Sequence, residues 1–158
     1  MVPPGSPIPG PATLIVLPGS KATIADMRAL REEGWDIDIL AHYRRGGLIL
    51  GLCGGYQMLG KSISDPLGLE GPAESIEGLG LLDLTTELAS AKRLQRVRGE
   101  SLGAPVSGYV MHMGETSGPG RNRPFATLEG TPEGAVDARQ IKKLEDAMRF
   151  ALSHGEPM

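Results

Sequence analysis

The only cysteine of the 158-residue sequence, Cys53, lies among glycines in the stretch GLCGGYQMLG at 51–60. Gly51 and Gly55 frame it as Gly-x-Cys-x-Gly, the cysteine form of a nucleophile elbow, in which a sharp strand-to-helix turn pushes the side chain outward. The N-terminal end of a helix stabilises a thiolate, which is the reactive form of cysteine. The stretch therefore predicts a thiol nucleophile, with a buried structural cysteine beside packing glycines as the alternative.

A thiol that attacks a carbonyl group needs N–H donors for the oxyanion that forms. The N–H of Gly54, directly after the cysteine, is the first candidate. The turn Gly19–Ser20 follows the neighbouring apolar segment and offers a second donor. We predict that the backbone amides of Gly54 and Gly19 face the oxyanion.

A cysteine nucleophile usually works with a base within hydrogen-bond reach. The sequence offers three histidines. His42 is expected on the exposed side of a helix, and His154 lies near the end of the chain, where fraying is expected. His112, in GYVMHMG, lies in an expected strand and is the base candidate, with a structural histidine as the alternative. The residue pattern alone leaves the partner of Cys53 open.

The elements that must position Cys53 are those of an α/β fold. The short apolar runs at 13–18 and 48–52 have the pattern of parallel strands that are covered on both faces. Apolar residues at helical spacing predict helices over 23–34 and 36–46, and a further helix directly after the cysteine. Cys53 is thus expected at the carboxyl end of a parallel strand, where ligands bind in such sheets.

The pattern changes after this first βαβ region. We interpret 62–75 as a loop and GLGLLDL at 78–84 as a strand. KRLQRVRG and APVSGYVMHMG alternate between polar and apolar residues and predict strands of a smaller antiparallel or edge region. Residues 117–135 are rich in turn-forming residues, and a helix is expected from Gln140 onward.

Length and composition fit one domain. With 40% hydrophobic and 22% charged residues, the chain can bury a core and keep a polar surface. The net charge of −3 argues against nucleic acid as a partner. No apolar run approaches the roughly 20 residues of a membrane span, and no signal peptide is recognised, so we expect a cytoplasmic protein. One cysteine excludes an intrachain disulfide, and we expect no metal site.

Four stretches together resemble the glutamine amidotransferase domain of cobyric acid synthase, over residues 1 to about 137. They are LPGSKATIADMRALREEGWD, GLCGGYQMLG, EGLGLLD and APVSGYVMHMG. LPGSK followed by TIAD is specific to this branch. CGGYQMLG and GLGLLD are shared more widely, including with the amidase subunit of lipid II isoglutaminyl synthase. The resemblance implies a class I amidotransferase with a three-layer, flavodoxin-like fold and a mostly parallel central sheet.

The resemblance also implies a reaction. Cys53 would attack the side-chain amide of glutamine, ammonia would leave, and water would hydrolyse the thioester. Gly54 and Gly19 would supply the oxyanion amides. Gln57 would lie against the amino-acid end of glutamine, with an exposed helix glutamine as the alternative, and Tyr56 would contribute to substrate binding. Ammonia would serve the ATP-dependent amidation of corrinoid carboxylates in cobalamin biosynthesis.

The sequence departs from the family pattern in three ways. No phosphate loop G-x-x-x-x-G-K-[ST] occurs, so the synthetase domain, with its ATP and Mg²⁺, is expected elsewhere on the protein or on a separate chain, and no cofactor is expected here. The first strand and helix of the domain are expected to be missing, which makes the fold incomplete at the N-terminus. The family's histidine motif, Tyr-Leu-His-Gly, does not occur, and His112 belongs to a different family element, Gly-Tyr-x-x-His-x-Gly.

We therefore expect residues 1–158 to form a single, partial glutamine amidotransferase domain. An exposed sheet edge would favour self-association or docking on a partner. Two alternatives stay open. The first is a catalytically impaired remnant, or partner-binding module, of the same fold. The second is the amidase subunit of a lipid II isoglutaminyl synthase-like enzyme.

Overall fold

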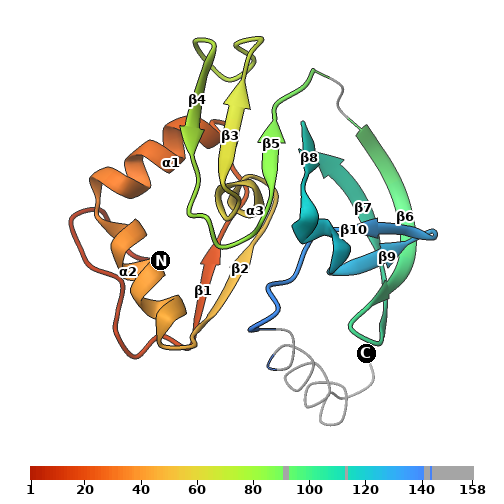
Figure 1. Cartoon of the computed structure of the whole chain (residues 1–158), viewed down its shortest axis with the longest axis horizontal. Helices are drawn as coiled ribbons and strands as arrows, with labels where there is room; N and C mark the ends of the chain where they lie inside the picture. Colours follow the sequence, from red (N-terminus) through yellow and green to blue (C-terminus); the bar gives the residue numbers. More distant parts are fainter. Residues whose placement is uncertain (91–92, 113, 141–142, 144–158) are drawn as a thin grey trace.

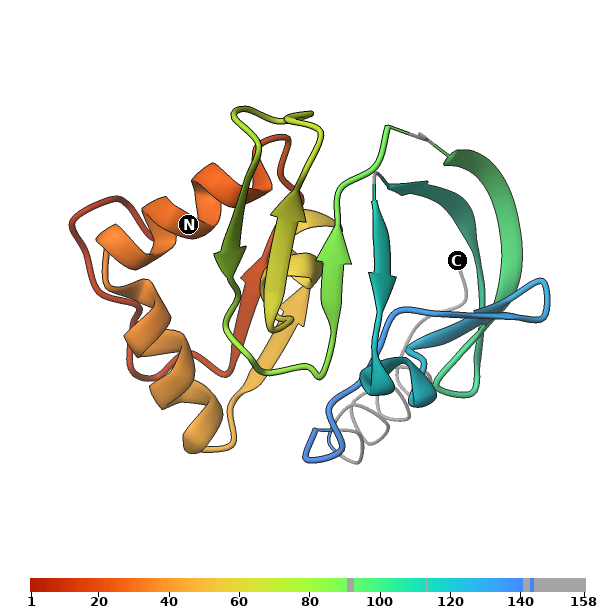
Figure 2. The same ribbon diagram turned by 45° about the horizontal axis from the view of Figure 1, so that its top comes forward.

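The structure is a computed structural model that describes residues 1–90, 93–112, 114–140 and 143, without the side chains of 93–94 and 110–112. Figure 1 shows the helices α1 and α2 at one end of the molecule and the strands β6, β7, β9 and β10 at the other. The remaining strands and α3 lie between these two ends. Figure 2 shows the same arrangement after a rotation. The mixture of helices and sheets confirms the predicted α/β class.

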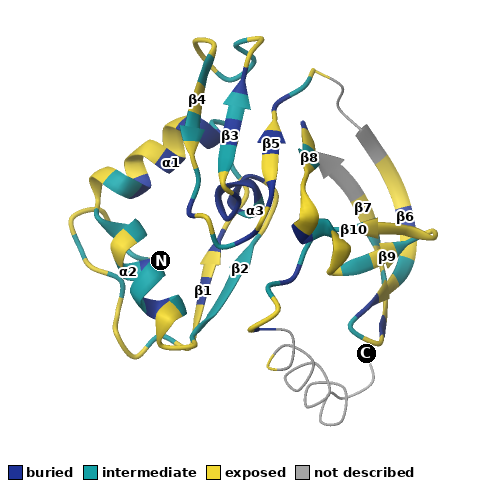
Figure 3. Ribbon diagram, in the orientation of Figure 1, coloured by how far each residue is buried: buried dark blue, intermediate teal, exposed yellow. Residues whose placement is uncertain are grey.

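Strands β1 (Leu14–Leu17) and β2 (Leu48–Gly51) pair in parallel, as the two apolar runs predict. Ile15 and Leu17 are buried in the main core, whereas Leu14 and Val16 are each 46% exposed. Successive side chains of a strand point to opposite faces, and only one face of β1 meets the core. Figure 3 shows this alternation of buried and exposed residues along β1. The expectation that both faces of this strand are covered is therefore wrong.

Helices α1 (Thr23–Glu32) and α2 (Trp35–Arg44) connect the two strands and confirm the two predicted helices. Gly34 separates them in the left-handed conformation, with φ at 73°, which glycine adopts without strain. The hydrophobic core forms where these helices meet the strands and the loop before β5. Its fully buried hydrophobic side chains are those of Met27, Ile39, Ile63, Leu84 and Leu88.

His42 is buried, with 3% of its surface exposed, so its expected position on the exposed side of α2 is wrong. Its Nε2 lies 3.0 Å from the carbonyl oxygen of Leu48, at the start of β2. The backbone of Gly47 packs so closely on the ring that a Cβ there would lie 2.1 Å from Nε2. His42 thus holds α2 against β2 and has a structural role.

The segment after α3 (Gly54–Met58) builds a four-stranded sheet in the order β4-β3-β5-β8. Its strands are β3 (Ser62–Asp65), β4 (Glu74–Glu77), β5 (Thr85–Glu87) and β8 (Glu115–Ser117). β3 and β5 are parallel, and the outer pairs are antiparallel. The predicted loop over 62–75 is therefore wrong at both of its ends, where short polar strands pair with each other.

The predicted strand over 78–84 is also wrong. Leu79, Leu82 and Leu84 are buried in the core, but their backbone follows a loop around the end of α3. The N–H of Leu79 donates to Met58 O at 2.8 Å, and that of Leu82 donates to Leu59 O at 2.9 Å. The density of leucines in GLGLLDL thus reflects burial and not an extended conformation.

A second four-stranded sheet, in the order β10-β9-β6-β7, is antiparallel throughout and confirms the predicted smaller antiparallel region. Its two hairpins turn at Leu102–Gly103 and at Glu129–Gly130, each with φ values of 49° and 81°. Positive φ at both positions is the requirement of a type I′ turn. The strands are β6 (Arg93–Ser101), β7 (Ala104–His112), β9 (Ala126–Leu128) and β10 (Thr131–Glu133).

The short 3₁₀ helix η1 (Pro119–Asn122) lies between β8 and β9. After β10 the chain runs back towards β2 through residues 134–140. The helix expected from Gln140 onward falls almost entirely outside the described residues. Within the described part of the chain, no helix has the length and apolar content to cross a bilayer.

Candidate active site

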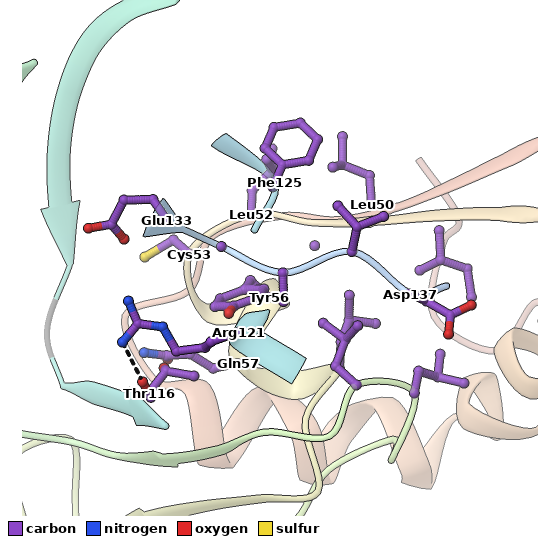
Figure 4. Close-up of a pocket in the computed structure, with 18 of the residues that line it drawn as sticks. Leu50, Leu52, Cys53, Tyr56, Gln57, Thr116, Arg121, Phe125, Glu133 and Asp137 are labelled. Carbon is purple, nitrogen blue, oxygen red and sulfur yellow. Dashed lines mark hydrogen bonds between the residues drawn. The ribbon is translucent and has the colours of Figure 1, made fainter. Parts of the chain in front are cut away.

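Cys53 lies between β2 and α3 with φ at 52° and ψ at −114°. This backbone conformation costs a residue other than glycine roughly 1–3 kcal/mol and occurs mainly at functional sites. The side chain is exposed and lines a cavity of about 680 Å³ (Figure 4). The predicted position at a strand-to-helix turn that faces a pocket is confirmed, and the role of nucleophile stays a prediction.

The glycines around Cys53 allow α3 to pack directly on the ends of the two strands. A Cβ on Gly51 would lie 2.7 Å from the oxygen of Gly55, and a Cβ on Gly55 would lie 2.1 Å from the oxygen of Leu17. Two hydrogen bonds then fix the turn, from Leu52 N to Leu17 O at 3.0 Å and from Gly55 N to Pro18 O at 3.1 Å. The Gly-x-Cys-x-Gly pattern is thus a packing requirement of the turn that projects Cys53.

Both glycines predicted as oxyanion donors lie near the cysteine. Gly54 is the first residue of α3, so the helix does not use its N–H. The loop before α1 packs on it, since a Cβ there would lie 2.9 Å from Ser20 Cβ. A Cβ on Gly19 would lie 3.5 Å from Cys53 Cβ. The structure brings these backbones together, and their role as oxyanion donors stays a prediction.

Gln57 and Tyr56 of α3 line the same cavity. Gln57 is only 7% exposed, so the alternative of an exposed helix glutamine is wrong. Burial raises the pKa of Tyr56 above its ordinary value, the charge of Arg121 opposes this rise and that of Glu133 adds to it. Tyr56 is therefore a neutral hydroxyl at neutral pH, near one positive and one negative group.

Arg121 and Glu133 are cavity residues that sequence reasoning missed. The guanidinium of Arg121, in η1, donates to the backbone oxygens of Thr116 at 3.2 Å and Pro132 at 3.1 Å. Glu133 directly follows Pro132 at the end of β10. Figure 4 shows both charged groups at the Cys53 end of the cavity. Neither residue belongs to a recognisable motif, so no local signal in the sequence could have found them.

The segment 134–140 forms the other end of the cavity. The hydroxyl of Tyr43 donates to Asp137 Oδ2 at 3.0 Å, which ties this segment to α2. The side-chain amide of Gln140 bonds to the start of β2 and to the residue before it: Oε1 accepts from Ile49 N at 3.3 Å, and Nε2 donates to Gly47 O at 3.2 Å. The segment therefore covers part of the open edge of β2, the strand that carries Cys53.

The base for Cys53 stays a prediction. His112 is the last residue of β7, and its side chain lies outside the described residues, as does the whole of His154. The described lining of the cavity contains no histidine. Its titratable side chains besides Cys53 are those of Tyr43, Tyr56, Glu115, Arg121, Glu133 and Asp137. In the described part of the chain, no group of three or more histidine, cysteine or acidic residues could hold a metal ion.

Comparison with solved structures defines the class of the fold. A crystal structure of a glutamine amidotransferase matches with a TM-score of 0.54, over 91% of this chain and 79% of that chain, at 19% sequence identity. This likeness confirms the predicted glutamine amidotransferase fold. The sequence narrows the class: the CobB/CobQ-like glutamine amidotransferase domain matches residues 1–144, and the chain belongs to this family.

Close relatives are cobyric acid synthases of three bacteria. The chain is 68% identical over 139 residues to that of Sphingopyxis alaskensis, 66% over 138 residues to that of Rhizorhabdus wittichii, and 64% over 139 residues to that of Novosphingobium aromaticivorans. Each match covers 87% of this chain but only 28–29% of the relative, so the chain spans less than a third of their length. The predicted resemblance to cobyric acid synthase is confirmed, and it is favoured over a lipid II isoglutaminyl synthase-like subunit.

Proposed function

We propose that the chain is a glutaminase domain that supplies ammonia for the ATP-dependent amidation of corrinoid carboxylates in cobalamin biosynthesis. The observation that carries the proposal is the geometry of Cys53, which a strained turn holds on the wall of a cavity. Membership of the CobB/CobQ-like amidotransferase family supports the same chemistry.

The reaction follows from a thiol in this position. The Cys53 sulfur attacks the side-chain amide carbon of glutamine, and the carbonyl oxygen becomes an oxyanion near the Gly54 and Gly19 backbones. The C–N bond then breaks, and the nitrogen leaves as ammonia after it gains a proton. Water attacks the resulting thioester, which releases glutamate and restores the thiol. The two amides stabilise both oxyanions, because each lies at the same oxygen position.

A second part of the enzyme, outside the glutaminase domain, would consume the ammonia in the amidation reaction. The relatives are more than three times as long as the matched segment, and we propose that this additional portion, on the same protein or a separate chain, binds ATP, Mg²⁺ and the corrinoid. The chain itself then needs glutamine and no cofactor. Because the acceptor reaction consumes ATP, we propose a cytoplasmic location.

A catalytically impaired domain of the same fold is the second candidate. It is favoured by the described cavity lining, in which no histidine lies beside Cys53. A general base contributes on the order of 10²- to 10⁴-fold to a rate. A domain without one would retain the binding site and the reactive thiol but release ammonia slowly.

The test is the reaction of Cys53 with 6-diazo-5-oxo-L-norleucine, a glutamine analogue that alkylates the attacking thiol. We expect one adduct on Cys53 by mass spectrometry, protection by L-glutamine, and no adduct in Cys53→Ser. Ammonia release from L-glutamine by the same preparations then separates an active glutaminase from an impaired domain. Absence of the adduct at saturating reagent would contradict the proposed function.

A further inference from the structure

We propose that Glu70 is a positioning residue for the reaction at Cys53. Its carboxylate holds the loop of residues 19–22 against Gly54, so that the two backbone amides expected to face the oxyanion keep their places. The inference rests on the proposed glutamine hydrolysis and adds a residue that does not touch the substrate, since Glu70 is not among the described residues that line the cavity. It acts through the first turn of α1.

The N-terminus of α1 takes a hydrogen-bond acceptor from a distant part of the chain. Ala22 precedes the helix and has no polar side chain to accept the N–H groups of the first turn. Glu70, in the connection between β3 and β4, supplies the acceptor: its Oε2 accepts the N–H of Thr23 at 2.5 Å, and its Oε1 accepts the Thr23 hydroxyl at 3.3 Å. The helix dipole favours a carboxylate at this end of a helix. A residue 47 positions later in the sequence therefore fixes the start of α1.

The turn that this carboxylate holds lies directly on the residue after the nucleophile. Thr23 is 1% exposed, and a Cβ on Gly54 would lie only 3.1 Å from its hydroxyl oxygen. The loop that leads into this turn begins at Gly19, where a Cβ would lie 3.5 Å from Cys53 Cβ. A shift of the turn would therefore displace the Gly19 amide and loosen the packing on the Gly54 amide.

Glu70 is itself held in place by the sheet that contains β3. Asp65, at the end of β3, is 1% exposed. Its carboxylate accepts the N–H groups of Leu69 and Glu70, each at 2.8 Å. Gly68 N donates to Asp65 O at 3.3 Å, and Gly68 has φ at 64°, so the chain turns tightly after the strand. A continuous series of hydrogen bonds and contacts thus runs from β3 through Glu70 to the loop beside Cys53.

The experiment measures how fast 6-diazo-5-oxo-L-norleucine labels Cys53 of the intact chain at increasing reagent concentration. The ketone oxygen of this reagent corresponds to the amide oxygen of glutamine, so displaced amides should lower the limiting rate. We expect Glu70→Ala and Glu70→Met to lower it by about 10- to 100-fold, the range for a misplaced catalytic group. The half-saturating concentration should change by less than about 3-fold, because Glu70 lies outside the cavity and binding of the reagent is a separate step.

Matched variants separate the hydrogen bond from a general loss of structure. Glu70→Gln keeps an oxygen that can accept the Thr23 N–H, so its limiting rate should stay within about 3-fold of that of the unsubstituted protein. Glu74→Ala also removes an acidic side chain that binds α1, through Arg28 at 2.6 Å, but away from the first turn, and should leave both constants unchanged. Iodoacetamide forms no oxyanion and should label Cys53 equally fast in all variants. Glu70→Met retains the length of the side chain and tests the same loss if Glu70→Ala does not fold.

Hydrogen exchange gives a measurement that does not depend on any reaction. In Glu70→Ala and Glu70→Met, the amides of residues 19–23 should exchange at least about 10-fold faster than in the unsubstituted protein, because the first turn of α1 opens locally. Glu70→Gln and Glu74→Ala should retain the slower exchange of this segment.

The outcomes separate this inference from the proposed function. The positioning role is overturned, and the glutaminase proposal stands, if Glu70→Ala and Glu70→Met keep the limiting rate or the exchange of residues 19–23. The same holds if Glu70→Gln loses as much as they do, or if the iodoacetamide rate falls in parallel. If the unsubstituted protein forms no adduct with the glutamine analogue, the glutaminase proposal is contradicted and the role of Glu70 is overturned with it.

Discussion

Replacement of Gly55 by alanine tests whether the close approach of α3 to β1 holds the Cys53 turn in place. An alanine Cβ would lie 2.1 Å from Leu17 O, and real Cβ contacts are almost never below 3.0 Å, so the two backbones must separate by about 0.9 Å. Leu17 O cannot move away freely, because it accepts the N–H of Leu52 at 3.0 Å. The side chain therefore forces either the helix or the strand end out of position.

The magnitude follows from two costs. Overpacking of a tight contact typically costs about 1–3 kcal/mol, and loss of the Leu52–Leu17 hydrogen bond adds about 1 kcal/mol. We expect Gly55→Ala to lower the free energy of unfolding by about 2–4 kcal/mol. For a chain of this size, that corresponds to a fall in Tm of roughly 5–15 °C and a fall in the urea midpoint of about 1–2 M.

The assay is urea unfolding followed by circular dichroism, with labelling of Cys53 by 6-diazo-5-oxo-L-norleucine measured below the transition. Gly71→Ala is the control, because no atom lies within 4 Å of a Cβ at that position. It should change the free energy of unfolding by no more than about 0.5 kcal/mol. A Gly55→Ala protein with an unchanged midpoint and an unchanged labelling rate would refute the packing argument for the turn.

Three further predictions concern acid stability, the edge of β2 and the rate of the reaction. Hydrogen bonds from the backbone N–H groups of Glu70 and Leu69 lower the pKa of Asp65. The stabilising effect of its carboxylate is therefore present above about pH 4 and is lost as the pH falls through the folded-state pKa. Asp65→Asn should make the urea midpoint depend less on pH over this acidic range. Gln140→Ala removes hydrogen bonds to Ile49 of β2 and to Gly47 just before it and should lower the free energy of unfolding by about 1–2 kcal/mol. Sedimentation velocity should show more self-association than for the unsubstituted protein, and an unchanged sedimentation profile would contradict a protective role of Gln140 at this edge. The described lining of the Cys53 cavity contains no histidine, and a general base contributes on the order of 10²- to 10⁴-fold, so the chain on its own should release ammonia from glutamine slowly. Turnover on the order of 1 per second would favour the active glutaminase over the impaired domain, and His112→Ala would then test whether His112 is the base.

The sequence by itself determined the parts of the fold that depend on local pattern. Short apolar runs gave β1 and β2, helical spacing gave α1 and α2, and the Gly-x-Cys-x-Gly pattern located the turn that carries Cys53. These inferences succeed because the period of apolar residues is a local property, and because the spacing of Gly51 and Gly55 around Cys53 marks the turn even though the backbone that Gly55 approaches, that of Leu17, lies far away in the sequence.

Only the tertiary structure decided which distant residues join Cys53. The leucines of 78–84 predicted a strand but pack as a buried loop, because hydrophobicity reports burial and not backbone conformation. His42, expected on the exposed side of a helix, is buried and packs against the backbone of Gly47. Arg121 and Glu133 reach the cavity from a 3₁₀ helix and a strand end far along the chain. No local pattern in the sequence predicts this proximity, since it depends on where η1 and the end of β10 lie relative to the turn in the folded chain.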